Sequence, residues 1–206
     1  MSEWTAARVM VALRDLGLVG DGPVRMRDLF DIAKQARDLP LVEVDRLMAE
    51  PSYAGRMAAF CVLDFQARAR PGDSVLCEAY LRHHDAIDAW DMVDRAAPWV
   101  VGSYVAGGPY AILHDLAASP DALRRRTAMT APLWFVKHGS DADVLAGFEV
   151  AAELHPDGDP LVHKPVGIYL AHAGQRLREQ LLTFLAEHED AMARPAVRIA
   201  RRKLST

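Results

Sequence analysis

Residues 58–65 read Ala-Ala-Phe-Cys-Val-Leu-Asp-Phe, and their apolar side chains recur with the period of an α-helix. Ala58, Cys61, Val62 and Phe65 stand at positions i, i+3, i+4 and i+7, so the four share one helix face. Alternation with a period of two, which would indicate strands, is scarce along the chain. The helical spacing returns at Val144, Phe148, Ala151 and Ala152, at Val162, Val166, Tyr169, Leu170 and Ala173, and at Leu177, Leu181, Phe184 and Leu185. The sequence therefore predicts an all-α protein.

Turn-forming residues interrupt this pattern at short intervals. Gly, Pro, Ser and Asp gather at 20–23, 71–73, 107–109, 119–121, 139–141 and 156–159. Dividing the chain at these breaks gives about ten to twelve helices, most of roughly 10–16 residues. Short helices in regular succession are typical of stacked antiparallel pairs, whereas a compact bundle would have fewer and longer helices. We therefore expect a HEAT-like solenoid with a unit of roughly 40 residues, forming a single domain over residues 1–206.

The composition is that of a soluble globular protein. The chain has 206 residues, of which 51% are hydrophobic and 25% charged. No apolar run approaches the roughly 20 residues of a membrane span, and Arg14 and Asp15 interrupt the apolar N-terminal stretch, which makes it a poor signal peptide. Cys61 and Cys77 fit neither a CxxC pair nor a disulfide framework. We therefore expect a cytoplasmic protein without membrane contact.

Charge is distributed unevenly along the chain. The formal net charge is −4, but residues 1–120 carry 12 basic and 17 acidic side chains, whereas residues 121–206 carry 12 and 11. The C-terminal part also holds two basic clusters: Arg124, Arg125 and Arg126, and the tail residues Arg194, Arg198, Arg201, Arg202 and Lys203. A local basic face on an acidic protein is compatible with binding to a polyanion.

Residues 88–95, Asp-Ala-Trp-Asp-Met-Val-Asp-Arg, predict a helix whose three acidic residues differ in surroundings. We expect Asp88 to cap the helix N-terminus. Asp91 is expected to form a solvated i, i+4 pair with Arg95, worth about 0.3 kcal/mol. Asp94 instead belongs to an apolar stripe formed by Trp90, Asp94, Ala97 and Val101 at i, i+4, i+7 and i+11.

A carboxylate in an apolar stripe needs compensation, because a lone charge there is costly. Asp94 could be a structural acid bonded to a neighbouring helix end or to an arginine. Alternatively, Trp90 and Asp94 together could form a wall for a cationic ligand, with an aromatic face and a fixed negative charge.

These residues resemble a known signature. The run Trp90-Asp91-Met92-Val93-Asp94 is similar to the WDxVD motif of the AlkD-like DNA alkylation repair family of HEAT-repeat alkylpurine DNA glycosylases. Further resemblances follow in the family's order over roughly residues 24–204. Residues 24–29 resemble VRxPxL, residues 125–128 resemble RRxA, and residues 162–167 resemble the HKAVGW helix. The final helix, which residues 192–194 precede, resembles the family's C-terminal helix.

The resemblance implies a fold and an activity. Members of this family stack HEAT-like helix pairs and hold duplex DNA against a basic concave face. They excise positively charged N3- and N7-alkylated purines without a base-flipping pocket, a metal or an organic cofactor. Carried over by position, Asp94 is the catalytic carboxylate, Trp90 its aromatic partner at the deoxyribose, and Arg126 the DNA-facing arginine. We accordingly expect a monofunctional, monomeric glycosylase acting in base excision repair.

Other basic residues are candidates for DNA contact. Since three successive residues of a helix cannot share a face, we expect Arg126 to point inward and Arg124 outward. The predicted DNA-binding residues are Arg125, Lys164, Arg194, Arg198, Arg201 and Arg202. The histidines have no metal-ligand spacing, so no metal site is expected. Trp99 and Trp134 fall in apolar runs and are predicted to be core residues.

The chain departs from the family pattern in the aromatic cleft. Ile168 stands where a second tryptophan is usual, and Pro165, where alanine is usual, costs about 3 kcal/mol inside a helix unless it starts or kinks the helix. These changes could widen the cleft for a bulkier adduct. They could also mark a non-catalytic relative that binds bent or branched DNA, and a HEAT-type protein-interaction scaffold is a third hypothesis.

Overall fold

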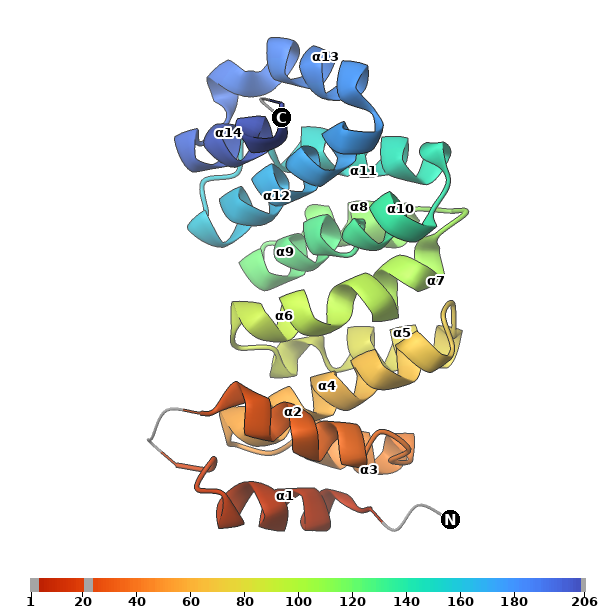
Figure 1. The fold of residues 1–206 in the computed structure, drawn as a ribbon, viewed down its shortest axis with the longest axis vertical. Helices are drawn as coiled ribbons and strands as arrows, with labels where there is room; N and C mark the ends of the chain where they lie inside the picture. Colours follow the sequence, from red (N-terminus) through yellow and green to blue (C-terminus); the bar gives the residue numbers. More distant parts are fainter. Residues whose placement is uncertain (1–3, 21–23, 205–206) are drawn as a thin grey trace. The chain divides into compact units, whose positions relative to one another are not determined.

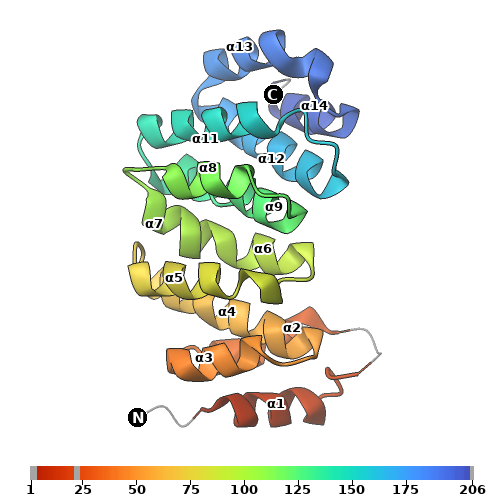
Figure 2. The ribbon, with the colours of Figure 1, turned by 180° about the vertical axis from the view of Figure 1, so that it is seen from behind.

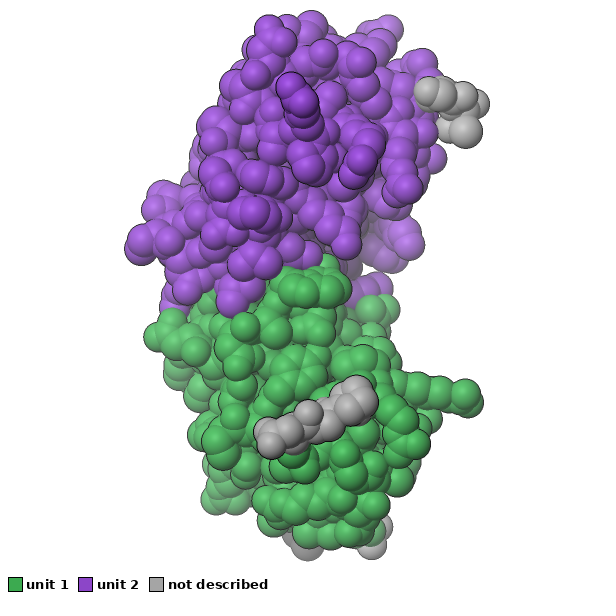
Figure 3. All heavy atoms as spheres, turned by 90° about the vertical axis from the view of Figure 1, so that its left-hand side faces the viewer, with its two compact units in different colours: residues 1–96 green, residues 97–206 purple. Residues whose placement is uncertain are grey.

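The computed structural model describes residues 4–20 and 24–204, and all regular structure in these residues is helical. They form fourteen α-helices with short 3₁₀ and π segments between some of them (Figure 1). This confirms the predicted all-α class and a helical-repeat fold. Two compact units, residues 1–96 and 97–206, divide the chain (Figure 3). The single domain over 1–206 stays a prediction.

Unit 1 is organised around one long buried helix. Its elements are α1 (Ala6–Asp15), α2 (Met26–Gln35), α3 (Leu41–Met48), α4 (Tyr53–Ala69), α5 (Ser74–Arg82), the 3₁₀ turn η1 (His84–Ala86) and α6 (Trp90–Ala97), whose last residue belongs to unit 2. Helix α4 packs against α2 and α3. Ala58, Cys61 and Val62 are fully buried, as the periodicity predicts, while Phe65 is half-buried. Ser52 caps α4 by accepting the Gly55 N–H.

Unit 2 contains stacked helix pairs. Its elements are η2 (Pro98–Gly102), α7 (Ser103–Val105), α8 (Ala111–Ala117), α9 (Ala122–Thr130), α10 (Leu133–His138), α11 (Asp141–Leu154), α12 (Pro160–Arg176), α13 (Arg178–His188), η3 (Glu189–Ala191), α14 (Arg194–Ala200) and η4 (Arg201–Lys203). Helix α8 packs on α9 and α11 on α12, while α9 also packs on α12 and α8 on α11. In Figure 2, α8 and α11 lie in front of α9 and α12. This is the two-layer stacking expected of helical repeats.

Helices α12 and α14 approach each other closely at one glycine. A Cβ on Gly167 would lie 2.7 Å from the Ala196 carbonyl oxygen and 2.9 Å from the Ile199 Cβ. Backbone therefore meets backbone at this seam, which joins the helix that carries Lys164 to the helix that carries Arg194 and Arg198.

The helix that begins at Trp90 changes form at Pro98. Proline has no N–H to donate to the carbonyl of Asp94, and residues 98–102 form a π-helical segment. The predicted stripe assumed a regular α-helix as far as Val101. The α-helical period holds for Trp90, Asp94 and Ala97, and the place of Val101 in the stripe stays a prediction.

Trp99 and Trp134 are half-buried rather than fully inside the core. Their ring centroids lie 6.4 Å apart, and the ring of the exposed His138 lies 5.1 and 5.0 Å from them. The prediction that both tryptophans are core residues was therefore only partly right.

Both cysteines are free and buried, Cys61 in α4 and Cys77 in α5. Burial raises the pKa of each thiol to about 12. Among the helices of the described residues, none is long and apolar enough to cross a membrane.

Asp143 organises the start of α11. This buried carboxylate accepts hydrogen bonds from the Gly107 N–H (2.6 Å), the Tyr110 hydroxyl (2.8 Å) and the Ser140 N–H (2.7 Å). Burial by itself would raise the pKa of Asp143, but these hydrogen bonds outweigh it and lower the pKa below its usual value.

We expect this carboxylate to make the stability of unit 2 pH-dependent. Because the folded-state pKa lies below the unfolded value of about 3.9, the stabilisation is complete above that value and is lost as the pH falls through the folded pKa. Asp143→Asn should lower the free energy of unfolding by about 2 kcal/mol at pH 7. Urea unfolding from pH 7 to pH 2.5 should show the deficit shrinking in acid. A constant deficit would contradict the role of the ionised group.

Candidate active site

Helix α6 carries the two residues singled out from the sequence. Trp90 is its first residue and is 48% exposed, and Asp94, one turn later, is half-buried. Residues four apart lie on the same side of an α-helix. The structure therefore places an accessible indole beside a carboxylate that solvent can reach, as the stripe predicts.

The neighbouring side of α6 is tied to α4. The Tyr53 hydroxyl donates to Asp91 Oδ2 (2.6 Å), and burial, followed by this hydrogen bond, raises the pKa of Tyr53. Arg95 Nη2 lies 2.8 Å from Asp64 Oδ2. The predicted surface pair of Asp91 with Arg95 was therefore wrong, because each has a partner on α4.

Arg95 and Asp64 form a buried ion pair in an aromatic setting. Asp64 is fully buried and also pairs with Arg68 Nε (2.9 Å). Burial raises the pKa of Asp64, against the opposing effect of the two arginines. The Arg95 guanidinium lies 4.7 and 4.8 Å from the ring centroids of Phe30 and Phe65. These contacts fix the rotation of α6 about its axis, and hence the direction of Trp90 and Asp94.

The segment before α6 is held by another arginine. Asp88 lies two residues before the first residue of α6, and its carboxylate accepts a hydrogen bond from Arg56 instead of capping the helix. Arg56 also donates to the carbonyls of Glu50 (2.8 Å) and Pro51 (2.7 Å). The capping prediction for Asp88 was wrong, and the residue instead links the loops that precede α4 and α6.

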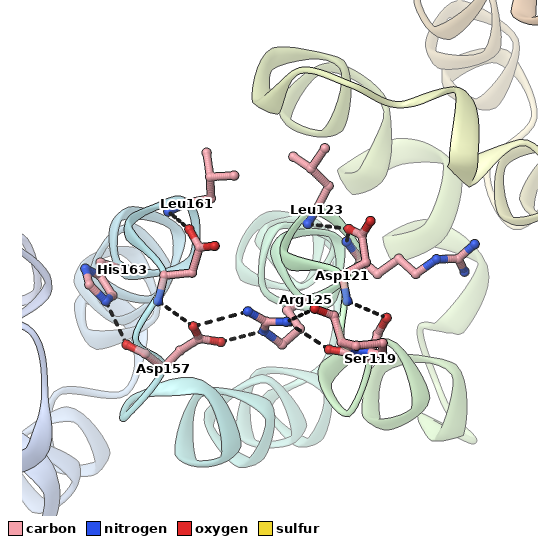
Figure 4. A network of polar contacts seen from close by, with 10 residues as sticks. Ser119, Asp121, Leu123, Arg125, Asp157, Leu161 and His163 are labelled. Atoms are coloured by element: carbon pink, nitrogen blue, oxygen red, sulfur yellow. Dashed lines mark hydrogen bonds and ion pairs between the residues drawn. The ribbon is translucent and has the colours of Figure 1, made fainter.

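In unit 2, Arg125 holds two loops together (Figure 4). Its Nε and Nη2 bind Asp157 at 2.6 and 3.4 Å, and its Nη1 donates to the carbonyls of Ser119 (2.9 Å) and Pro120 (2.8 Å). His163 Nε2 donates to the carbonyl of Asp157 (2.7 Å). Arg125 and His163, both in motifs of the resemblance, thus join the α8–α9 loop to the α11–α12 loop.

Arg126, on α9, is buried. It is 3% exposed, and its Nη1 donates to the carbonyl of Leu161 (2.6 Å) at the start of α12. Arg124 is half-buried. The expectation that Arg126 points into the DNA-binding face stays a prediction, and in the structure its guanidinium donates to a backbone carbonyl of the protein itself.

The other predicted DNA-binding residues are at the surface. Lys164 on α12, Arg194 and Arg198 on α14, and Arg201 and Arg202 in η4 are exposed. Arg201 Nη2 pairs with Glu189 Oε2, which partly neutralises it. Ile168, one turn after Lys164, is half-buried. No cluster of three or more His, Cys, Asp or Glu able to hold a metal lies among residues 4–20 and 24–204.

The family model for the DNA alkylation repair enzyme matches residues 23–204. The chain belongs to this family. The crystal structure of AlkD2 from Streptococcus mutans is similar to this DNA alkylation repair protein, with a TM-score of 0.68 and 14% identity over 95% of this chain and 97% of that one. At this identity the likeness shows the fold alone. No curated protein matches the chain.

In this DNA alkylation repair protein the predicted site residues fall into two groups. Trp90, Lys164, Arg194, Arg198, Arg201 and Arg202 are exposed, and Asp94 and Ile168 are half-buried. Arg125 and Arg126 are engaged with protein atoms. The sequence did not predict the residues of α4 that hold α6: Tyr53 and Asp64, which bind Asp91 and Arg95, and Arg68, which binds Asp64. A lone acid inside an apolar helix was the available signal for Asp64.

Proposed function

We propose that the chain is a monofunctional DNA glycosylase that hydrolyses the N-glycosidic bond of positively charged N3- or N7-alkylated purines in duplex DNA. The observation that carries this proposal is the pairing of Trp90 and Asp94 on the accessible side of α6, while Asp91 and Arg95 are tied to α4.

The chemistry needs little beyond a placed negative charge. An alkylated purine already carries a positive charge and leaves with both electrons of the glycosidic bond. The developing oxocarbenium charge on the sugar is the remaining barrier. A carboxylate about 4 Å away, at an effective dielectric near 20, stabilises that charge by about 4 kcal/mol, which is roughly a thousandfold in rate. In this proposal Asp94 supplies the charge and orients the water that adds to C1′.

Trp90 is proposed to lie against the deoxyribose. Its indole face attracts a cationic sugar and keeps bulk water away from Asp94, which strengthens the electrostatic effect. Its 48% exposure leaves the ring surface available for such a contact.

For DNA binding we propose the exposed cations of unit 2. Lys164, Arg194, Arg198 and Arg202 are exposed and are proposed to contact phosphates, and Arg201, which pairs with Glu189, is proposed as a weaker contact. For Arg125 the proposed role is to hold the loops that precede α9 and α12, since a phosphate would have to compete with Asp157 for its guanidinium. Phosphate contacts of this kind position the duplex without reading its sequence.

The direct test is excision from a duplex containing a single 7-methylguanine. We expect an alkali-labile abasic site in the modified strand and none in an unmodified duplex. A 3-methyladenine duplex and a bulky N7 adduct define the substrate range. Salt-sensitive binding without excision would instead support the second candidate function, a non-catalytic relative that binds DNA. Ile168, which stands where the family usually has a second tryptophan, favours this candidate.

We expect DNA affinity to depend steeply on salt because the proposed contacts are phosphate contacts. Replacing both Arg194 and Arg198 with glutamine should lower the slope of log K against log salt by about 2, since each lost phosphate contact removes about 0.9. Fluorescence anisotropy from 50 to 300 mM salt measures the slope. Arg178→Gln, an exposed arginine on α13, is the control and should leave the slope near that of the unmodified protein. An unchanged slope in the double variant would exclude α14 from the interface.

A further inference from the structure

Pro165 creates an unusual demand inside α12. It lies within the helix, five residues after the first residue, Pro160, and is buried. In a regular α-helix the N–H of residue 165 would donate to the carbonyl of Leu161, but proline has no N–H. The Leu161 carbonyl is therefore left without its helical donor.

A side chain from another helix supplies that donor. Arg126 Nη1, on α9, lies 2.6 Å from the Leu161 carbonyl oxygen, and Arg126 is 3% exposed. Helices α9 and α12 pack directly against each other in unit 2. A carbonyl group inside a protein carries a cost when it has no hydrogen-bond donor, and the bond from Arg126 removes that cost at Leu161.

We infer that Arg126 is a positioning residue that takes the place of the missing Pro165 N–H and holds the first turns of α12 against α9. Lys164 and Ile168 are on these turns, next to Pro165. Arg126 thereby acts on the DNA-binding surface through α12, and its guanidinium is not a phosphate contact. The effect on DNA rests on the proposed function, whereas the structural link between the two residues does not.

The arrangement also explains how the helix tolerates its proline. An interior proline is costly partly because it removes one hydrogen bond, and the Arg126 contact restores a bond to the same acceptor. Beside it, Arg125 fixes Asp157 in the loop that leads into α12. The two adjacent arginines of α9 thus hold two successive points of one chain segment, Asp157 and Leu161.

The first test is a double-mutant cycle of Arg126→Met and Pro165→Ala, read by urea unfolding. With Pro165 present, Arg126→Met should lower the folding equilibrium constant, the ratio of folded to unfolded protein, by about 30-fold, because the Leu161 carbonyl loses its donor. In the Pro165→Ala background, where the backbone N–H of the alanine can donate to Leu161, the loss should be about fivefold or less. Equal losses in the two backgrounds would overturn the inference.

Pro160→Ala is the matched control for the cycle. Pro160 is the first residue of α12, a position at which a backbone N–H would make no hydrogen bond within the helix. Its substitution should show no coupling to Arg126→Met. If Arg126→Met alone does not fold, recovery of a folded protein on adding Pro165→Ala supports the link, and failure to recover contradicts it.

The second test separates positioning from phosphate contact. If Arg126 acts through α12, Arg126→Met should weaken DNA binding, and Pro165→Ala in the same chain should restore the affinity to within about threefold without changing the salt slope. If Arg126 touched a phosphate, the slope would fall by about 0.9 and the proline change would not rescue it. A chain that binds no DNA would defeat the proposed function, while the unfolding cycle would still decide the link.

Discussion

Replacing Asp94 with asparagine should lower the excision rate on 7-methylguanine DNA by about a thousandfold while leaving the protein folded. The substitution keeps the size of the side chain and removes only its charge, which in the proposed mechanism contributes about 4 kcal/mol to stabilising the oxocarbenium ion. Single-turnover excision with alkaline cleavage measures the rate. Asp94 is half-buried and at the accessible side of α6, so we expect the thermal unfolding midpoint to move little.

Asp88→Asn is the matched control for this experiment. This substitution also removes one negative charge, six residues before Asp94 in the sequence. The side chain of Asp88 is 56% exposed and pairs with Arg56. Its excision rate should stay within about threefold of the unmodified protein, because an exposed ion pair contributes little. Full activity in Asp94→Asn would refute the proposed mechanism, and equal losses in both variants would point to a general effect of charge.

Replacing Arg95 with methionine should destabilise the protein by about 3 kcal/mol or more. The change leaves the fully buried Asp64 with only Arg68 as a cationic partner, and breaking a buried pair costs more than the pair contributes. It also removes the cation from between Phe30 and Phe65. Urea unfolding, followed by circular dichroism, measures the loss.

Arg68→Met provides the comparison, since both arginines bind the same carboxylate. The Arg68 side chain is 44% exposed and that of Arg95 is 21% exposed, so Arg68→Met should cost about 1 kcal/mol or less. Equal losses would mean that the position of Arg95 between the rings has no special weight. Because Arg95 holds α6, its loss should also reduce excision, beyond the effect of Arg68→Met.

The helical class and the placement of Trp90 and Asp94 could be predicted from sequence because both depend on local periodicity. One turn of helix fixes which residues share a face, whatever the rest of the chain does. The same argument does not extend to Val101, since residues 98–102 form a π segment whose period differs from that of an α-helix.

Partners far apart in the sequence were not predictable in this way. The expected pair of Asp91 and Arg95 respects helix geometry, but Tyr53 and Asp64, on α4, compete for the two side chains. A buried partner displaces a solvated one because an ionised group inside the protein must be satisfied. Local spacing carries no information about which helix packs on that face.

For Pro165 the sequence predicts the cost but not the partner that compensates for it. Its cost inside α12 follows from the chemistry of proline and could be stated from the sequence. The remedy comes from Arg126, on another helix, through a hydrogen bond to a backbone atom of Leu161. Every residue has a backbone carbonyl, so the identity of residue 161 does not indicate that its carbonyl accepts this hydrogen bond. The contact is therefore visible only in the structure.

The buried cysteines have a consequence for a member of a DNA alkylation repair family. Agents that methylate purines are electrophiles, and a cysteine reacts with them as the thiolate rather than as the thiol. With both pKa values raised to about 12, the two thiols stay protonated at pH 7, and neither Cys61 nor Cys77 is open to solvent. The folded chain is thereby protected at its two thiols from the alkylating agents whose damage its family repairs.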